Sequence, residues 1–272
     1  MRLKFLVAYD GPSFSGWQSQ PGKGTVQDAL EEAARAVCGT RVCFHGAGRT
    51  DAGVHAFGQV CHADFPSSER MDAGAWRRAL NAHLPPTLRV LDAVEAAPDF
   101  HARFSATGKI YRYRIFNGEV LPPWEFGRAW HLPGKFHDDS ARAAAAVMTG
   151  PHDFAAFSAN RGSPVNDTRR TLARVEVSRD AHVISLEFEG GGFLYKMARM
   201  LTAAIAHCAR GRCGPEEIAA RLESGIPKWT HVAPPHGLAL VRVLYGRPPT
   251  GGQGVGEGVG DGLGEGEGVG WG

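Results

Sequence analysis

Strand-like and helix-like segments alternate along the first 247 residues of this 272-residue chain, and this alternation constrains the fold more than any other feature. Apolar residues that alternate with polar ones predict a strand, whereas apolar residues that recur at helical spacing predict a helix. The predicted strands are 2–9, 54–65, 88–96, 109–117, 169–178, 182–189 and 237–245. The predicted helices are 25–37, 72–82, 138–148, 193–209 and 215–223.

The order of these elements divides the chain into two halves of similar rhythm, residues 1–105 and 106–247. Residues 179–181 separate two strands so closely that these strands must form an antiparallel hairpin. Strands that interleave with helices in this way bury one face of a sheet beneath a helical layer. We therefore predict an α+β chain with two related halves.

The end of the chain differs in composition from everything before it. From Thr250 onwards, 12 of 23 residues are glycine. Such a segment has little apolar surface to bury and much backbone entropy to lose, so we predict a disordered tail over residues 248–272. Without the four acids of this tail, the chain has 30 basic and 24 acidic residues, and this excess permits a polyanionic partner.

Several classes of protein are disfavoured by what the sequence contains. The apolar stretches, such as Ala143–Met148, are too short to span a bilayer, and a strand-like pattern begins at Arg2 without a signal peptide, so we expect a cytoplasmic protein. The five cysteines form no CxxC pair, which predicts reduced thiols. The twelve histidines include no HExxH motif, and we expect no metal site.

The segment 46–60 is the strongest candidate for chemistry. Glycines at 46, 48 and 53 allow a tight loop, and this loop delivers Arg49, Thr50 and Asp51 immediately before a predicted strand. Taken alone, the aspartate can equally be a residue that caps a turn, with Arg49 an ordinary surface charge. The residues by themselves leave both interpretations open.

The whole segment resembles the signature of the TruA-type tRNA pseudouridine synthases, in which an Arg-Thr-Asp-Ala-Gly-Val-His run surrounds an essential aspartate. Further blocks resemble the family in the same order, and together they cover about residues 3 to 245. These blocks are 9–11, 16–18, 25–27, 81–85, 100–106, 111–113, 152–154, 193–199 and 236–238. The resemblance implies two related ferredoxin-like halves, joined through mixed or antiparallel sheets, with helices on one face and a central RNA-binding cleft.

The resemblance also implies roles for four residues. Asp51 matches the catalytic aspartate, which acts either as a nucleophile or as a base while uracil detaches, rotates and rejoins through carbon. Tyr111 matches an active-site tyrosine that stacks on the target base and is a candidate for later proton removal. Arg199 matches the arginine that pairs with the aspartate, and Arg49 the arginine that fills the space left by the extruded uridine.

The implied substrate is tRNA, at positions 38, 39 and 40 of the anticodon stem-loop, and the implied active form is a homodimer. Uridine and pseudouridine are isomers, so the reaction needs no cofactor. A stacked uridine must be flipped out of the RNA, and contacts to phosphates have to offset the cost. Candidate phosphate contacts are three basic clusters: Arg77 and Arg78; Lys109, Arg112 and Arg114; Arg169 and Arg170.

Two other functions are weighed against this one. A non-catalytic RNA-binding or tRNA-folding protein on the same scaffold would have no need of Asp51 together with Tyr111 and Arg199. A hydrolase that uses histidines would need a paired histidine or metal arrangement, which the sequence lacks. The sequence analysis therefore favours an isomerase.

Overall fold

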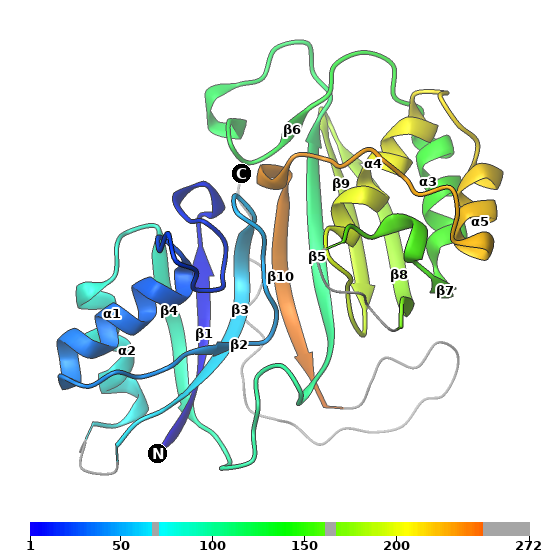
Figure 1. The fold of residues 1–272 in the computed structure, drawn as a ribbon. Coiled ribbons are helices and arrows are strands. Elements are labelled where there is room, and N and C mark those ends of the chain that lie inside the picture. The colour runs from blue at the N-terminus through cyan, green and yellow to red at the C-terminus, as the bar shows by residue number, and fades with distance from the viewer. Residues whose placement is uncertain (67–70, 161–166, 247–272) are drawn as a thin grey trace, which may run out of the picture.

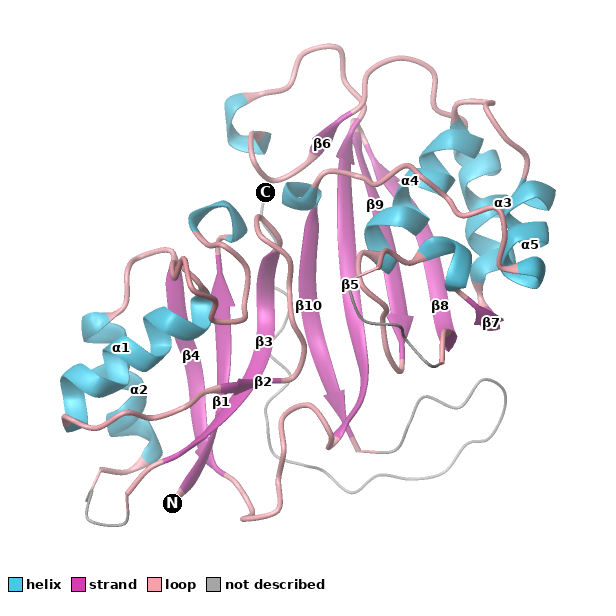
Figure 2. Ribbon diagram, viewed as in Figure 1, coloured by secondary structure: helices cyan, strands magenta, loops and turns pink. Residues whose placement is uncertain are grey.

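The computed structural model describes residues 1–66, 71–160 and 167–246, and the predicted tail lies outside these ranges. Its strands form one ten-stranded mixed sheet with the order β4-β1-β3-β10-β5-β9-β8-β7, in which β2 pairs with β3 and β6 with β5 (Figure 2). The strands are β1 (Arg2–Tyr9), β2 (His45–Gly46), β3 (His55–Asp64), β4 (Leu88–Glu95), β5 (Ala106–Phe116), β6 (Trp130–His131), β7 (Gly150–Asp153), β8 (Arg169–Asp180), β9 (Val183–Gly190) and β10 (Leu238–Tyr245).

The α-helices fall into two groups, one over each half of the sheet (Figure 1). Helices α1 (Val26–Cys38) and α2 (Ala73–His83) accompany the strands of the N-terminal half. Helices α3 (Asp138–Met148), α4 (Met197–Ala209) and α5 (Pro215–Ser224) accompany those of the C-terminal half. The predicted strands and helices are all present among the described residues, and their ends differ from the prediction by a few residues.

The two halves share one topology. Strands β1, β2, β3 and β4 alternate with α1 and α2 as a βαββαβ unit in the spatial order β4-β1-β3-β2. Strands β5, β8, β9 and β10 with α3 and α4 repeat the same order as β10-β5-β9-β8, to which β6, β7 and α5 are added. This is the arrangement of ferredoxin-like units. The predicted duplication is therefore confirmed at the level of topology.

The two halves meet where β3 and β10 run parallel, and in the described residues their strand pairing consists of two residue pairs, His55 with Ala239 and Ala56 with Leu240. Paired residues of neighbouring strands project to the same face of a sheet. One row of paired residues therefore crosses the sheet on one face: Tyr9, Ala56, Leu240, Tyr111 and Phe188. All five side chains are buried, so the apolar faces of both halves lie on the same side, as predicted.

Local signals in the sequence explain why α1 forms where it does. The Thr25 side chain accepts a hydrogen bond from the Asp28 amide, and the Asp28 carboxylate accepts one from the Thr25 amide, which completes a capping box. The helix ends at Gly39, whose left-handed conformation (φ 71°) suits glycine. The predicted start and end of this helix are confirmed.

Helix α4 corrects one prediction, because it begins at Met197 and not at Phe193. Lys196 has a left-handed backbone (φ 60°), which interrupts the helical path. The Tyr195 carbonyl accepts a hydrogen bond from the Ala159 amide at 3.0 Å and is thus tied to a different segment. Residues 193–196 form a loop that enters the site described below.

The close approach of β3 and β10 predicts that the stability of the protein is sensitive to substitution of Gly58. A Cβ added at Gly58 would lie 2.5 Å from the backbone oxygen of Val241, a contact that only backbone movement can relieve. We expect Gly58→Ala to lower the free energy of unfolding by about 1–3 kcal/mol. Urea unfolding followed by circular dichroism measures this change.

The matched control is Gly22→Ala, since a Cβ at Gly22 would meet nothing within 4 Å. Its free energy of unfolding should stay within about 0.5 kcal/mol of the wild type. Equal stability of the two variants would show that the junction between β3 and β10 is not tightly packed.

Candidate functional site

Asp51 lies in the loop between β2 and β3, and its neighbours in the chain hold this loop in place. The Trp17 amide donates a hydrogen bond to the Thr50 carbonyl at 3.1 Å, and the hydroxyls of Thr50 and Tyr9 are 2.8 Å apart. The Val54 amide donates to the Asp51 carbonyl at 3.1 Å and closes a turn. The aspartate is therefore held by backbone contacts on both sides.

Glycines allow the surrounding backbone to approach this loop closely. Gly16 has φ 91°, and a Cβ on it would lie 2.7 Å from the Thr50 carbonyl oxygen. Gly53 has φ 80°, a conformation that glycine adopts without strain. The prediction that glycines in this segment allow a tight loop with positive φ is confirmed at Gly53.

The Asp51 carboxylate forms an ion pair with Arg199, which lies in the first turn of α4. Nη1 of Arg199 is 3.0 Å from Oδ2 of Asp51, and the two side chains are 12% and 18% exposed. Nε of Arg199 donates to the Ala233 carbonyl at 2.8 Å, so the guanidinium is fixed from both ends. An anchored guanidinium sets the direction of the carboxylate.

Tyr111 lies on β5, and its ring forms one wall of the same space. The ring packs edge-on against Phe193, with 4.8 Å between the ring centroids. Burial raises the pKa of Tyr111 well above its usual range, and the nearby Tyr9 and Asp51 add to this effect. The phenol is therefore uncharged at neutral pH.

His55 is the last residue of the Arg-Thr-Asp-Ala-Gly-Val-His run. It has a structural role that was not predicted from the sequence. Its Nδ1 accepts a hydrogen bond from the Gly11 amide at 3.1 Å. Nε2 therefore carries the ring hydrogen, and it lies 2.9 Å from the Gly127 carbonyl and 3.1 Å from the His236 carbonyl. One buried ring thus joins three segments that are far apart in the chain.

A cavity of about 910 Å³ opens over Asp51 and receives residues from both halves. Six of its lining residues carry a positive charge, and Asp51 is the one acid among them. The cations are Arg49, Arg103, Lys109, Arg170, Lys196 and Arg199. The aromatic lining residues are Trp17, Phe44, Phe104, Tyr111, Phe193 and Tyr195. Cations interleaved with flat apolar rings suit a nucleic acid.

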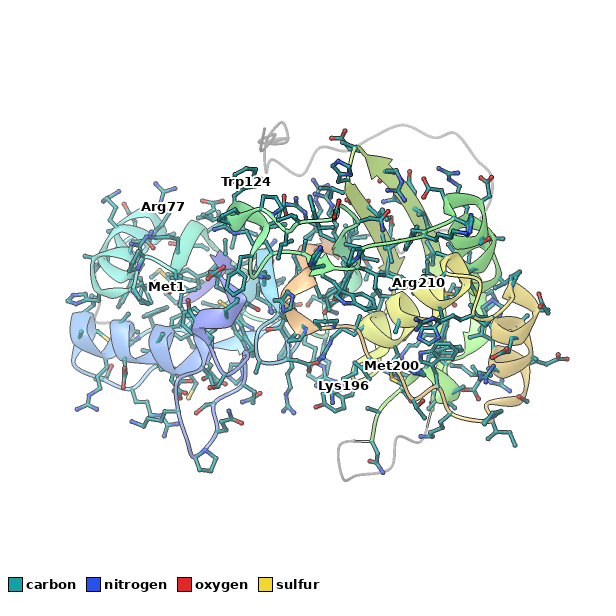
Figure 3. The ribbon with its side chains drawn as sticks, turned by 90° about the horizontal axis from the view of Figure 1, so that it is seen from above. Met1, Arg77, Trp124, Lys196, Met200 and Arg210 are labelled. Atoms are coloured by element: carbon teal, nitrogen blue, oxygen red, sulfur yellow. The ribbon has the colours of Figure 1, made fainter. Side chains whose placement is uncertain are left out.

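The structure brings some of the predicted basic residues to this cavity and not others. Arg49, Lys109 and Arg170 line it, and Arg169 lines an adjoining depression of about 600 Å³ that shares Arg170. Arg77 and Arg78 lie on α2 and line neither space. Arg77 lies well away from the cavity residue Lys196 (Figure 3).

The structure does not bring Arg112 and Arg114 to this cavity, although the sequence grouped them with Lys109. Side chains alternate between the faces of a strand, so these two residues project away from Tyr111. Arg112 pairs instead with Glu187 at 2.8 Å, and Arg114 pairs with Glu125 at 2.7 Å. The three basic residues of this strand were predicted as one cluster, but the alternation separates Lys109 from Arg112 and Arg114.

Several cavity residues were not predicted as site residues, and among them are Arg103, Phe104 and Lys196. The first two form a basic–aromatic pair, a pattern that does occur in nucleic-acid sites and that the sequence offered as a signal. Among the described residues, no cluster of histidine, cysteine or acidic side chains is arranged to hold a metal ion. No helix in the described part of the chain has the length and hydropathy needed to cross a bilayer.

The chain is similar to known proteins over most of its length. The family model described as tRNA pseudouridine synthase matches residues 6–105 and 144–246. The chain is 47% identical to tRNA pseudouridine synthase A of Akkermansia muciniphila, over 90% of this chain and 95% of the relative. It is 40% identical to tRNA pseudouridine synthase A of Geobacillus kaustophilus, over 90% of this chain and 94% of the relative.

A solved structure, the crystal structure of a Cbf5-Nop10-Gar1 complex, contains a chain that aligns with a TM-score of 0.36 and 13% identity. The alignment covers 88% of this chain and 49% of that chain. A likeness at this level supports no argument about the site.

The burial of Tyr111 predicts a dependence of stability on alkaline pH. A raised pKa means that the phenol ionises in the unfolded chain near its reference value of about 10, and only at higher pH in the folded protein. The contribution is present below pH 10 and is lost as the pH rises towards the folded pKa, by up to about 1.4 kcal/mol per pH unit.

Urea unfolding of the wild type and of Tyr111→Phe, measured from pH 9 to pH 11, isolates this contribution from those of other groups. The free energy of unfolding should fall less steeply with pH in Tyr111→Phe. Parallel curves for the two proteins would contradict the burial of this phenol.

Proposed function

The chain belongs to the tRNA pseudouridine synthase family and isomerises uridine to pseudouridine in tRNA, and we propose that Asp51 is its catalytic residue. The observation that supports this role is the ion pair of Asp51 with Arg199 inside a basic cavity, next to the ring of Tyr111. A carboxylate that is directed by an anchored cation, and that a flipped base can reach, is suited to act as nucleophile or base.

The other cavity residues receive roles that agree with their positions. Tyr111, as a neutral phenol, offers a flat surface on which the target uracil stacks, and Phe193 supports that ring. Arg199 orients Asp51. Arg49 is exposed at the cavity and is available to fill the space that the uridine leaves in the RNA.

The chemical routes available to Asp51 make the same demand on its carboxylate. Attack on the ribose or the base, and removal of a sugar proton, all need an unprotonated carboxylate near the glycosidic bond. In each route the bond from the sugar to nitrogen breaks and a bond from the sugar to carbon forms, with no atom gained or lost. The reaction consequently requires no redox partner or group donor.

We further propose that the substrate uridines are those at positions 38, 39 and 40 in the anticodon stem-loop, and that the enzyme is a cytoplasmic homodimer. The uridine positions and the homodimer rest on the resemblance of the sequence to the TruA-type family, and the cytoplasmic location rests on the shortness of its apolar stretches. The target uridine has to reach Asp51 inside the cavity, so the protein has to flip the base out of the stem at a cost of a few kcal/mol. Contacts to the backbone phosphates elsewhere on the tRNA offset this cost.

Replacement of Asp51 tests the catalytic proposal. Asp51→Asn keeps the size of the side chain but removes its charge, and we expect the rate of pseudouridine formation to fall at least about 10³-fold. The measurement is carbodiimide labelling of unmodified tRNA after incubation, read by primer extension so that each modified position is identified.

The matched control is Asp139→Asn, because Asp139 is a fully exposed carboxylate on α3 that pairs with Arg142. Its activity should equal that of the wild type. Activity in Asp51→Asn would exclude Asp51 as the catalytic group, and product at other tRNA positions would contradict the proposed specificity. If the wild type binds tRNA without product, the non-catalytic RNA-binding alternative holds.

The arrangement of cations predicts which arginines contact phosphate. Arg170 lines the cavity, whereas Arg112 lies on the opposite face with Glu187. We expect Arg170→Gln to weaken tRNA binding and to reduce the slope of log affinity against log salt by roughly 0.7–0.9. Filter binding between low and physiological salt measures both quantities.

Arg112→Gln is the control for this experiment. It removes the same charge from the same half of the protein, and its affinity and salt slope should match the wild type. A larger loss in Arg112→Gln than in Arg170→Gln would place the RNA on the opposite face of the sheet.

A further inference from the structure

Phe104 is an apolar ring held open to solvent at the edge of the proposed active site. It is 77% exposed, although it lines the same cavity as Asp51. Exposure of a phenylalanine forgoes the stabilisation that burial provides. An exposed ring beside the cations of a cavity is the combination that binds single-stranded nucleic acid.

The turn that carries Phe104 is fixed by a dense set of hydrogen bonds. Nδ1 of His101 accepts from the amides of Arg103 and Phe104, at 3.1 Å and 3.3 Å. The Ser105 amide donates to the His101 carbonyl at 2.9 Å, and the Ser105 hydroxyl accepts from the His101 amide at 3.0 Å. The ring is thus presented by a preorganised turn.

Hydrogen bonds to side chains of the sheet anchor this turn. The Ala102 amide donates to Nδ1 of His62 on β3 at 3.2 Å, and the Tyr245 hydroxyl of β10 donates to the Ala102 carbonyl at 2.8 Å. Ala102 is fully buried between these two contacts. The turn is therefore connected to strands of both halves of the sheet.

The surroundings of the ring suit one kind of ligand. The imidazole of His101 lies against the ring with 4.3 Å between centroids, and the Arg103 guanidinium is 5.7 Å from the ring centroid. Arg103 and Lys109 both line the cavity, and burial together with the positive charge of Arg103 lowers the pKa of Lys109. No ion pair of Arg103 or Lys109 with an acid is formed among the described residues.

We propose that Phe104 and Arg103 form a subsite for a second unpaired nucleotide, one that flanks the target uridine in the RNA. Its base stacks on the Phe104 ring, and its phosphate lies against the side chains of Arg103 and Lys109. Stacking on a phenyl ring accepts any base, so this subsite holds the strand beside the target without reading its sequence. The inference rests on the proposed function and adds a second contact to the same site.

The expected effect is on binding rather than on chemistry. Phe104→Ala should raise KM for tRNA by about tenfold, within the range found for loss of one base–aromatic stack, and leave kcat unchanged. Phe104→Tyr retains the ring and should restore KM. Because Phe104 is mostly exposed, these variants should unfold at the temperature of the wild type.

Phe126→Ala is the matched control, since Phe126 is 79% exposed but does not line the cavity. Its KM should not change. An unchanged KM in Phe104→Ala, or an equal rise in Phe126→Ala, would overturn the subsite. These outcomes are distinct from failure of the proposed function, in which the wild type itself would form no pseudouridine.

A photochemical crosslink locates the flanking nucleotide directly. Anticodon-arm RNA carrying 5-iodouridine on either side of the target is irradiated with the wild type and with Phe104→Ala, and the crosslinked peptides are identified by mass spectrometry. We expect a crosslink to Phe104 that the alanine variant lacks. Crosslinks confined to other segments would overturn the proposal.

Discussion

The ion pair between Asp51 and Arg199 joins residues that are 148 positions apart, and the site depends on this contact. The carboxylate comes from a loop of the N-terminal half, and the guanidinium comes from α4 of the C-terminal half, where the Ala233 carbonyl holds it. The halves themselves are joined by a short parallel contact between β3 and β10. The site therefore exists only when both ferredoxin-like units are folded and docked.

Charge is distributed unequally between the two faces of the sheet. On the outer face, Arg112 and Arg174 both pair with Glu187, so positive charge is locally balanced. In the cavity, six cations accompany a single acid. Like charges held close together repel one another, and this repulsion destabilises the folded protein. Binding of a polyanion between the cations reduces the repulsion. A modest net charge of +2 conceals this separation.

The sequence predicted what local signals determine. The helical spacing of apolar residues in α1 and the alternation in β5 sufficed to position these elements, because their causes lie within a few residues. The predicted start of α4 was wrong. Lys196 has a left-handed backbone, and its neighbour Tyr195 is bonded to the distant residue Ala159. Nothing in residue spacing alone pairs Asp51 with Arg199, and only the resemblance to a known family suggested it. Arg103 and Phe104 were missed because their exposure at the cavity follows from tertiary contacts of Ala102.

The proposed isomerisation makes a demand on the cavity that hydrolysis of the same bond would not make. A hydrolase can release its detached base, whereas here the uracil has to remain, turn and rejoin the sugar through carbon. A flat surface such as the ring of Tyr111, supported by Phe193, allows a base to rotate in its own plane without losing contact. An ionised phenol at that position would attract cations and water instead, and burial moves this ionisation of Tyr111 to still higher pH.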